Sequence, residues 1–171
     1  MDLILIALIV LIPLFAQIYV MSTYKSTMRH SNSKGLTGYD VARQILDENG
    51  LNDLIIVETN GTLTDHYDPN RKVIRLTRDI YHGNSIASLA VAAHETGHAI
   101  QDKEGYFFLR FRHFLFPIVN IISSFSYYLI LFGFILEIID LVWIGIFATG
   151  FGILFQIVTL PVEFNASNRA K

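Results

Sequence analysis

Three long apolar segments limit what this chain can fold into more than any other feature of its sequence. They cover residues 3–20, about 114–136 and about 141–160, and only Glu137–Asp140 separates the second from the third. Each is about as long as a helix that crosses the hydrocarbon layer of a bilayer, which is roughly 30 Å thick. Pro13 is compatible with such a helix, because lipid-embedded helices tolerate proline. We therefore predict three transmembrane helices, the last two antiparallel and joined by a tight turn.

The first apolar segment is predicted to remain in the protein as an anchor. A cleaved signal peptide has a basic stretch before its apolar run and small residues at the cleavage site. This chain begins Met1-Asp2 with no basic residue, and the flank after the run reads MSTYKSTMRH. The composition, with 52% hydrophobic and 16% charged residues, also favours a membrane protein.

Basic residues gather at one end of each apolar segment. The opposite ends carry only acids, namely Asp2, Glu137 and Asp140. Because basic residues stay on the cytoplasmic side, we predict a multi-pass protein of the cell membrane with residues 21–113 and the tail after 160 in the cytoplasm. The basic residues are Lys25, Arg29, Lys34, Arg110, Arg112, Arg169 and Lys171.

Residues 21–113 are polar enough to fold as one small α+β unit. Thr37 followed three residues later by Asp40 resembles a capping box, and Gly50 is a typical helix stop, so we predict a helix over about 38–48. A second helix is expected to begin after Asn84 or Ser85 and to end near Gly105.

Three β-rich runs lie between these two helices. They read LIIVE, TLTDHY and KVIRLT, with turn signals at Asn60-Gly61 and at the sequence DPN. We predict a three-stranded antiparallel sheet from them. The run KVIRLT is expected to be an edge strand that pairs with an extended peptide. The predicted domains are thus residues 1–20 as anchor, 21–113 as a cytoplasmic α+β unit, 114–160 as a transmembrane hairpin, and 161–171 as a separate short segment.

The second predicted helix contains the sequence HETGH. Because the chain has no cysteine, a metal ion must be held by nitrogen and oxygen atoms. His94 and His98 are four residues apart, so a helix places both imidazoles on one face, within reach of a single zinc ion. In H-E-x-x-H, the glutamate, here Glu95, is the general base rather than a ligand. Gly97 leaves room for another backbone or a substrate to approach between the histidines.

An apolar helix with two histidines at this spacing by coincidence is the alternative. Roughly one sequence of this composition in a hundred would carry the motif by chance. Two histidines and a glutamate are costly to bury in an apolar helix unless they are paired or bind a metal. We therefore favour zinc.

A catalytic zinc usually has three protein ligands, and no third histidine follows HETGH at the expected spacing. We select Glu163 in LPVEFNASNRA, because it follows the third apolar segment and so lies on the same predicted membrane side. If a helix begins at Pro161, Glu163 and Ser167 share one of its faces. The alternative is that Glu163 only caps the start of an interfacial helix or snorkels from it to the membrane surface.

The segments PLFAQ, LTDHYDP, AAHETGHAIQ and TLPVEFNASNRA together resemble the YugP-like family of bacterial membrane proteins, described as neutral zinc metallopeptidases. The resemblance covers essentially the whole chain. More remotely, the chain is similar to the HtpX-type membrane metallopeptidases, whose second motif is E-[FY]-x-A-D. That resemblance implies a gluzincin-like site with Glu163 as third zinc ligand. It also implies that the family's chains continue past Lys171, so we expect a truncated sequence.

Ser167 departs from the pattern of those metallopeptidases. An aspartate stands there in the resembled group and orients a zinc-bound histidine, and a hydroxyl is a weaker partner for that purpose. Either another acid such as Asp65 or Asp68 takes the role, or zinc is held less firmly.

Stabilising the oxyanion of the transition state requires a donor besides the metal. His66 and Tyr67 are candidates for this donor. The equally weighted alternative is that both are ordinary residues of a turn. The other histidines, His30, His82 and His113, are expected to be ordinary surface residues.

The sequence therefore predicts a membrane-anchored zinc endopeptidase with Glu95 as general base. Its expected partners are a peptide or protein substrate and the lipid bilayer, and the net charge of −2 gives no reason to expect nucleic acid. Quality control of membrane proteins follows by analogy only. An intramembrane protease is one alternative, although charges at Arg78, Asp79 and Asp102 leave too short an apolar run. A non-catalytic zinc-binding scaffold or regulator is the other, and it would not need Glu95. The sequence indicates no oligomeric state.

Overall fold

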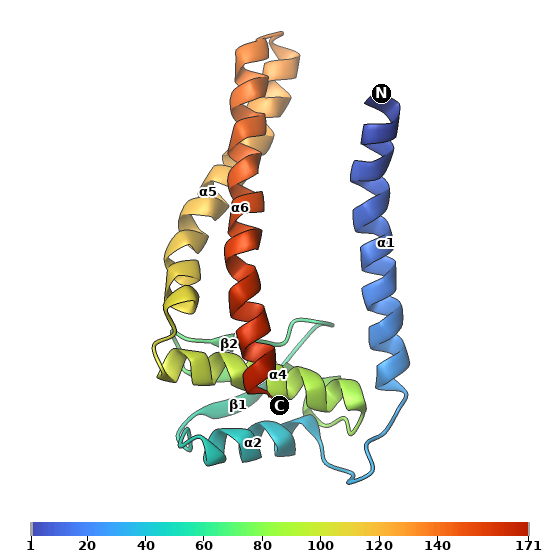
Figure 1. Cartoon of the computed structure of the whole chain (residues 1–171), viewed down its shortest axis with the longest axis vertical. Helices are drawn as coiled ribbons and strands as arrows, with labels where there is room; N and C mark the ends of the chain where they lie inside the picture. The colour runs from blue at the N-terminus through green and yellow to red at the C-terminus, as the bar shows by residue number, and fades with distance from the viewer. Residues whose placement is uncertain (1, 171) are drawn as a thin grey trace. The chain divides into compact units, whose positions relative to one another are not determined.

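The computed structural model describes residues 2–170, which form six helices and one small sheet (Figure 1). The chain divides into two compact units, residues 1–96 and 97–171, and the boundary falls inside one helix. The predicted α+β class is confirmed. The elements are α1 (Asp2–Met28), α2 (Gly38–Glu48), β1 (Ile55–Thr59), β2 (His66–Asp68), β3 (Val73–Thr77), α3 (Arg78–Tyr81), α4 (Ile86–Lys103), α5 (Phe107–Ile135) and α6 (Ile139–Arg169).

Helix α2 has the bounds and the capping box that the sequence predicts. The Thr37 hydroxyl accepts a hydrogen bond from the backbone N–H of Asp40, and the Asp40 carboxylate accepts from the backbone N–H of Thr37. Hydrogen bonds from the side chain and then the backbone of Thr37 hold the pKa of Asp40 below its ordinary value. Gly50 follows the helix with φ +63°, the left-handed conformation expected at a helix stop.

The sheet is mixed, so the prediction of an all-antiparallel sheet was wrong. The strand order is β1-β3-β2, with β1 parallel and β2 antiparallel to β3. Four of the five residues of β3 are buried, and a strand this apolar is most stable in the middle of a sheet. Both edges of β3 are therefore occupied, and its predicted role as a peptide-binding edge was also wrong. Asn60-Gly61 makes no tight hairpin, because a longer connection with Leu63 at φ +57° carries the chain to β2.

Helix α4 begins and ends where the sequence indicates. The Ser85 hydroxyl accepts a hydrogen bond from the Ser88 N–H at 3.0 Å, so Ser85 caps the start. At the other end, Tyr106 N–H bonds to the Gln101 carbonyl and Gly105, at φ +66°, bonds to Asp102, which is a Schellman motif. Both ends of the helix that carries HETGH are therefore fixed locally.

The end of α1 is joined to the beginning of α4 within the first unit. The Ile86 N–H donates to the His30 carbonyl at 2.8 Å, and Asn32 N–H donates to Asn84 carbonyl, also at 2.8 Å. Ser31 and Ser85 form an isolated β-bridge. Backbone hydrogen bonds therefore join the end of the first apolar helix to the start of the helix that carries the histidines.

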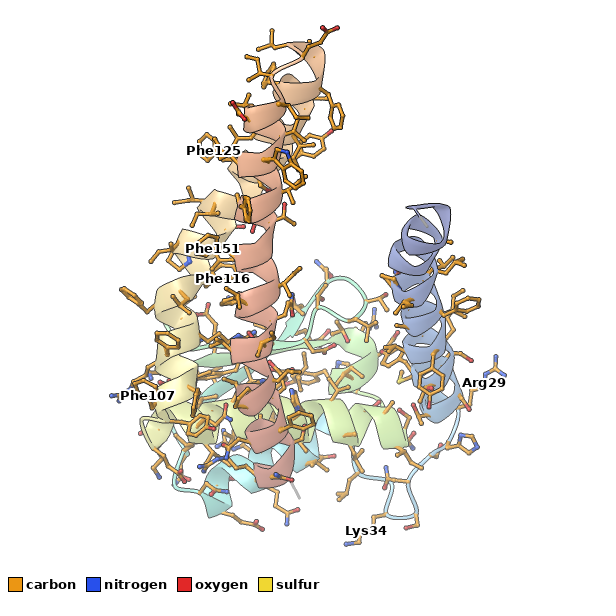
Figure 2. The ribbon with its side chains drawn as sticks, turned by 45° about the horizontal axis from the view of Figure 1, so that its top comes forward. Arg29, Lys34, Phe107, Phe116, Phe125 and Phe151 are labelled. Atoms are coloured by element: carbon orange, nitrogen blue, oxygen red, sulfur yellow. The ribbon has the colours of Figure 1, made fainter. Side chains whose placement is uncertain are left out.

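Helices α5 and α6 form the predicted hairpin within the second unit and lie side by side (Figure 1). Glu137 makes the turn at φ +58°. A Cβ added to Gly145 would lie 2.9 Å from the Ser126 carbonyl oxygen, so the two helices approach at backbone distance. Phe116, Phe125 and Phe151 point outward and are more than half exposed, as lipid-facing side chains would be (Figure 2).

Two helices, α5 and α6, are long and apolar enough to cross a membrane by length and composition. The remaining predicted span, the first apolar segment at residues 3–20, lies in α1. The side chains of residues 2–6 and 8–10 fall outside the described ones, and this span stays a prediction. Helix α6 runs through Pro161 to Arg169, so no new helix begins at that proline. The loss of one backbone N–H is tolerated inside a helix whose other hydrogen bonds remain.

Candidate metal centre

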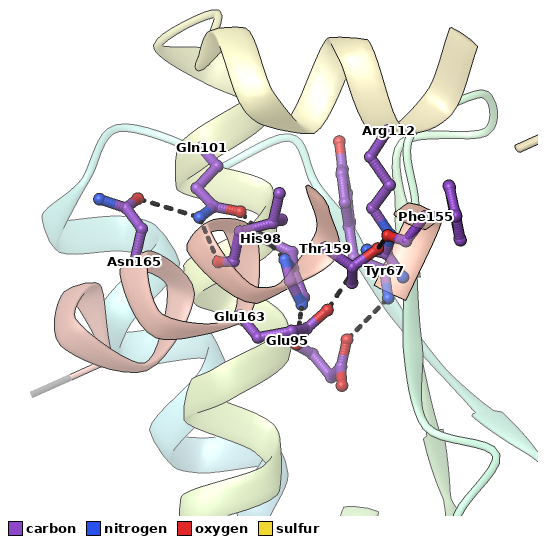
Figure 3. Close-up of polar contacts among 10 residues, drawn as sticks. Tyr67, Glu95, His98, Gln101, Arg112, Phe155, Thr159, Glu163 and Asn165 are labelled. Carbon is purple, nitrogen blue, oxygen red and sulfur yellow. Dashed lines mark hydrogen bonds and ion pairs between the residues drawn. The ribbon is translucent and has the colours of Figure 1, made fainter. Parts of the chain in front are cut away.

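In the first unit, α4 carries His94 and Glu95 beside the sheet. Glu95 is 8% exposed, and its Oε2 accepts a hydrogen bond of 3.0 Å from the backbone N–H of Tyr67 on β2 (Figure 3). A buried carboxylate needs such donors, because burial without them is costly. The contact fixes the carboxylate against the sheet edge formed by β2.

A hollow of about 340 Å³ opens beside the same two residues. Its walls come from α4 and from the connection between β1 and β2, and they are mostly apolar. The residues that line it are Leu63, Asp65, Ala90, Val91, His94 and Glu95. Space for a side chain or a short peptide segment therefore adjoins the histidine and the glutamate.

In the second unit, α4 and α6 bring His98 and Glu163 together. His98 Nε2 lies 3.5 Å from Glu163 Oε2, and His98 is 8% exposed. Ligand atoms of a tetrahedral zinc site, with metal bonds of about 2.0–2.1 Å, lie about 3.4 Å apart. The separation therefore fits two ligands of one zinc ion. His94 precedes His98 by one turn on the same continuous helix.

Glu163 also contacts a cation on α5. Its Oε1 lies 3.5 Å from Arg112 Nη1, while the other oxygen faces His98. The two oxygens are thus directed to different partners, and the carboxylate is held between them.

Gly97 allows α6 to approach α4 closely, as the sequence suggested. A Cβ on Gly97 would lie 2.4 Å from the Ala166 carbonyl oxygen and 2.9 Å from its carbon. Ala166 is fully buried, and Glu163 is one turn before it on α6. The absence of a side chain between the two histidines therefore determines how near the Glu163 helix can come to α4 in this unit.

Replacing Gly97 with alanine should push the two backbones apart. The added methyl meets backbone rather than a flexible side chain, and overpacking of this kind costs about 1–3 kcal/mol. We expect lower thermal stability and lower zinc affinity, measured by a thermal shift assay and by competition with a fluorescent chelator. Gly150→Ala in α6 is the matched control, because no atom lies within 4 Å of its added Cβ. Equal effects of the two changes would contradict the close-contact explanation.

Sequence reasoning missed Gln101. This residue is fully buried, and its Oε1 lies 3.0 Å from His98 Nδ1 (Figure 3). Its Nε2 donates to the Val162 carbonyl at 2.8 Å and to Asn165 Oδ1 at 2.9 Å. The available signal was the position of a glutamine three residues after His98, on the same side of the helix.

The other acids and histidines proposed from the sequence are placed as follows. Asp65 accepts from the Thr77 N–H at 2.6 Å, and Asp68 accepts from two N–H groups of its own turn. His66 is exposed, and its Nδ1 lies 2.8 Å from the Thr64 carbonyl. These contacts leave the orienting role of the two acids, and the oxyanion role of His66 and Tyr67, as predictions. Of the remaining histidines, His82 pairs with Glu58 at 2.7 Å on the surface.

The described part of the chain thus combines two helices long and apolar enough to cross a membrane with histidine and carboxylate donors, a combination typical of membrane proteins with a metal site. Within the second unit, His98 and Glu163 are placed so that they could hold a metal ion together, and His94 lies one turn earlier on the same helix. A family model described as "Putative neutral zinc metallopeptidase" matches residues 2–171, and the chain belongs to this family. The family implies Zn²⁺ as cofactor.

A curated relative extends the comparison. The chain is similar to the "Putative membrane protease YugP" of Bacillus subtilis (strain 168), with 46% identity over 157 residues. The aligned region covers 92% of this chain and 70% of the relative. No solved structure matches the chain. The resemblance drawn from the sequence is therefore confirmed at the level of the family.

Proposed function

We propose that this chain is a membrane-anchored zinc endopeptidase of the gluzincin type, with His94, His98 and Glu163 as zinc ligands and Glu95 as general base. The observation that carries the proposal is the 3.5 Å approach of Glu163 to the second histidine of HETGH in the second unit. This approach brings a carboxylate from α6, far along the chain, to the HETGH motif, which by itself supplies only two zinc ligands. The family description and the name of the relative support the peptidase activity.

The residues have distinct roles in the proposed reaction. When bound, zinc polarises the peptide carbonyl and lowers the pKa of a water molecule to about 7. Glu95 takes a proton from the attacking water and delivers it to the leaving amine. The Tyr67 N–H holds the Glu95 carboxylate in one position, so that little reorganisation is needed when the proton moves.

Substrate is proposed to bind beside β2 and in the adjacent hollow. Strand β2 is an edge of the sheet, and extended peptides commonly add to such an edge. The hollow offers Leu63, Ala90 and Val91 to an apolar side chain of the substrate. Proteins with exposed apolar segments, such as damaged membrane proteins, fit these features, and the distribution of basic residues supports a site on the cytoplasmic side.

Removal of zinc tests this proposal. The full chain, purified in detergent, should contain about one zinc ion and cleave casein; 1,10-phenanthroline should remove both the metal and the activity. Added Zn²⁺ should restore cleavage, whereas Mg²⁺ should not, because magnesium prefers six oxygen ligands. Zinc content by mass spectrometry and release of casein fragments are the measurements. Undiminished cleavage after the metal has been removed would refute a zinc mechanism.

A further inference from the structure

Gln101 is a buried polar side chain at the contact between α4 and α6 in the second unit. Its exposed fraction is 0%, so both ends of its amide need hydrogen-bond partners inside the protein. The partners come from both helices: His98 on α4, and Val162 and Asn165 on α6. The Gln101 side chain thus connects His98, one proposed zinc ligand, to the backbone of Val162. Val162 directly precedes Glu163, the other proposed ligand in this unit.

The Val162 carbonyl determines which way the amide points. A carbonyl oxygen can only accept, so the group 2.8 Å from it must be the NH₂ end of Gln101. Asn165 Oδ1 is a second acceptor for that end, at 2.9 Å, and it also accepts from Arg169 Nε at 2.7 Å. Arg169 in turn pairs with Glu104, near the end of α4. The carbonyl end of Gln101 must therefore face His98.

This orientation selects one tautomer of His98. The Gln101 oxygen can only accept, so the Nδ1 atom 3.0 Å away must carry the proton. A neutral imidazole protonated at Nδ1 has its lone pair on Nε2, the atom that lies 3.5 Å from Glu163 Oε2. Metal-binding histidines commonly donate their other N–H to a protein acceptor, which fixes the ring and raises its basicity.

We propose that Gln101 is the positioning residue of the zinc site: its carbonyl holds His98 with Nε2 directed at the metal, and its NH₂ group fixes the segment of α6 that carries Glu163. The inference rests on the proposed zinc-binding role of His98 and Glu163. In the resembled metallopeptidases an aspartate orients a zinc-bound histidine, and Ser167 stands at that position here. Gln101 would supply His98 with the orienting partner that this aspartate provides. The partner is an uncharged amide on the same helix.

Two replacements of Gln101 separate positioning from simple packing. Gln101→Met has a similar shape but neither accepts from His98 nor donates to α6. Gln101→Glu loses the same donated bonds to α6 but keeps an oxygen that accepts from Nδ1. We expect Gln101→Met to weaken zinc binding about 10–100-fold, and Gln101→Glu to weaken it clearly less, because the contact with His98 Nδ1 is kept while the bonds to α6 are lost. Asn165→Ala leaves the contacts of Gln101 with Val162 and His98 in place. It should therefore lower zinc affinity less than Gln101→Met does.

The measurements are made on the full chain in detergent. Zinc affinity is obtained by competition with a fluorescent chelator, the ligand field from the visible spectrum of the Co²⁺ form, and folding from circular dichroism of the metal-free protein. Gln101→Met should alter the Co²⁺ spectrum, whereas Gln101→Glu should preserve its tetrahedral bands. Equal losses of zinc affinity in Gln101→Met and Gln101→Glu would show that Gln101 only joins the helices. Wild-type affinity in Gln101→Met would refute the proposal entirely.

A wild-type chain that binds no zinc would overturn the proposed function and this inference together. Wild-type zinc binding that is insensitive to Gln101→Met would overturn the inference alone. If the Gln101→Glu variant fails to fold, Asn165→Ala distinguishes the two roles of Gln101. A loss of zinc affinity equal to that of Gln101→Met would again indicate that only the connection to α6 is important.

Discussion

Replacing Glu95 with glutamine should leave zinc bound while peptide cleavage falls by a factor of about 10²–10⁴, the usual contribution of a general base. Glutamine has nearly the same shape, and its carbonyl can still accept the hydrogen bond from the Tyr67 N–H. The amide cannot take a proton from water, so only the chemical step is lost. Zinc content and kcat/KM for a casein-derived fluorogenic peptide measure the two effects separately.

Glu48→Gln is the control for this change. Glu48 is an exposed glutamate at the end of α2, and its replacement should alter neither quantity. Undiminished cleavage by Glu95→Gln would exclude Glu95 as the base. If the wild-type chain binds zinc but cleaves nothing, the alternative of a zinc-binding scaffold or regulator would be favoured, because such a protein has no need of the base.

Replacing Glu163 with alanine should weaken zinc binding about 10²-fold and abolish cleavage. Structural zinc sites bind with about 10–16 kcal/mol shared by four ligands, so one ligand contributes about 3 kcal/mol, or a factor of about 10² in affinity. His94 and His98 would remain as a weak two-histidine site. Competition with a fluorescent chelator measures the affinity, and the fluorogenic peptide measures the cleavage.

The Arg112 contact provides a control for Glu163→Ala. If Glu163 served only to pair with Arg112, then Arg112→Gln would weaken zinc binding as much as Glu163→Ala. As a ligand, Glu163 should still bind the metal without the arginine, with a smaller loss of affinity. Wild-type affinity in Glu163→Ala would instead show that another residue is the third ligand.

Local features of the fold were predictable because their causes lie within a few residues. Thr37 and Asp40 cap α2 through their own hydrogen bonds, and Ser85 and Gly105 delimit α4 in the same way. The order of strands depends instead on which strand is buried on both faces, and β3 occupies the centre. The turn residues contain no information on which strand is central. Asn60-Gly61 therefore suggested a hairpin between β1 and β2 that does not form.

The site was predictable in part for a similar reason. HETGH supplies its own geometry, because two histidines four residues apart on a helix must share a face. Glu163 came from the charge distribution and from the family resemblance, and the structure places it beside His98. Gln101 was missed because a glutamine in a helix is usually a surface residue, and its burial arises only from the approach of α6, which Gly97 permits.

The location of Glu163 near the end of α6 also has a consequence in time. It is synthesised 65 residues after His98 (163 − 98), which at about 5–20 residues per second takes about 3–13 s. During that interval the ribosome-bound chain contains both histidines and Glu95 but lacks the proposed third ligand. On the proposed function, cleavage activity would therefore become possible only after α6, the last described helix, has been made.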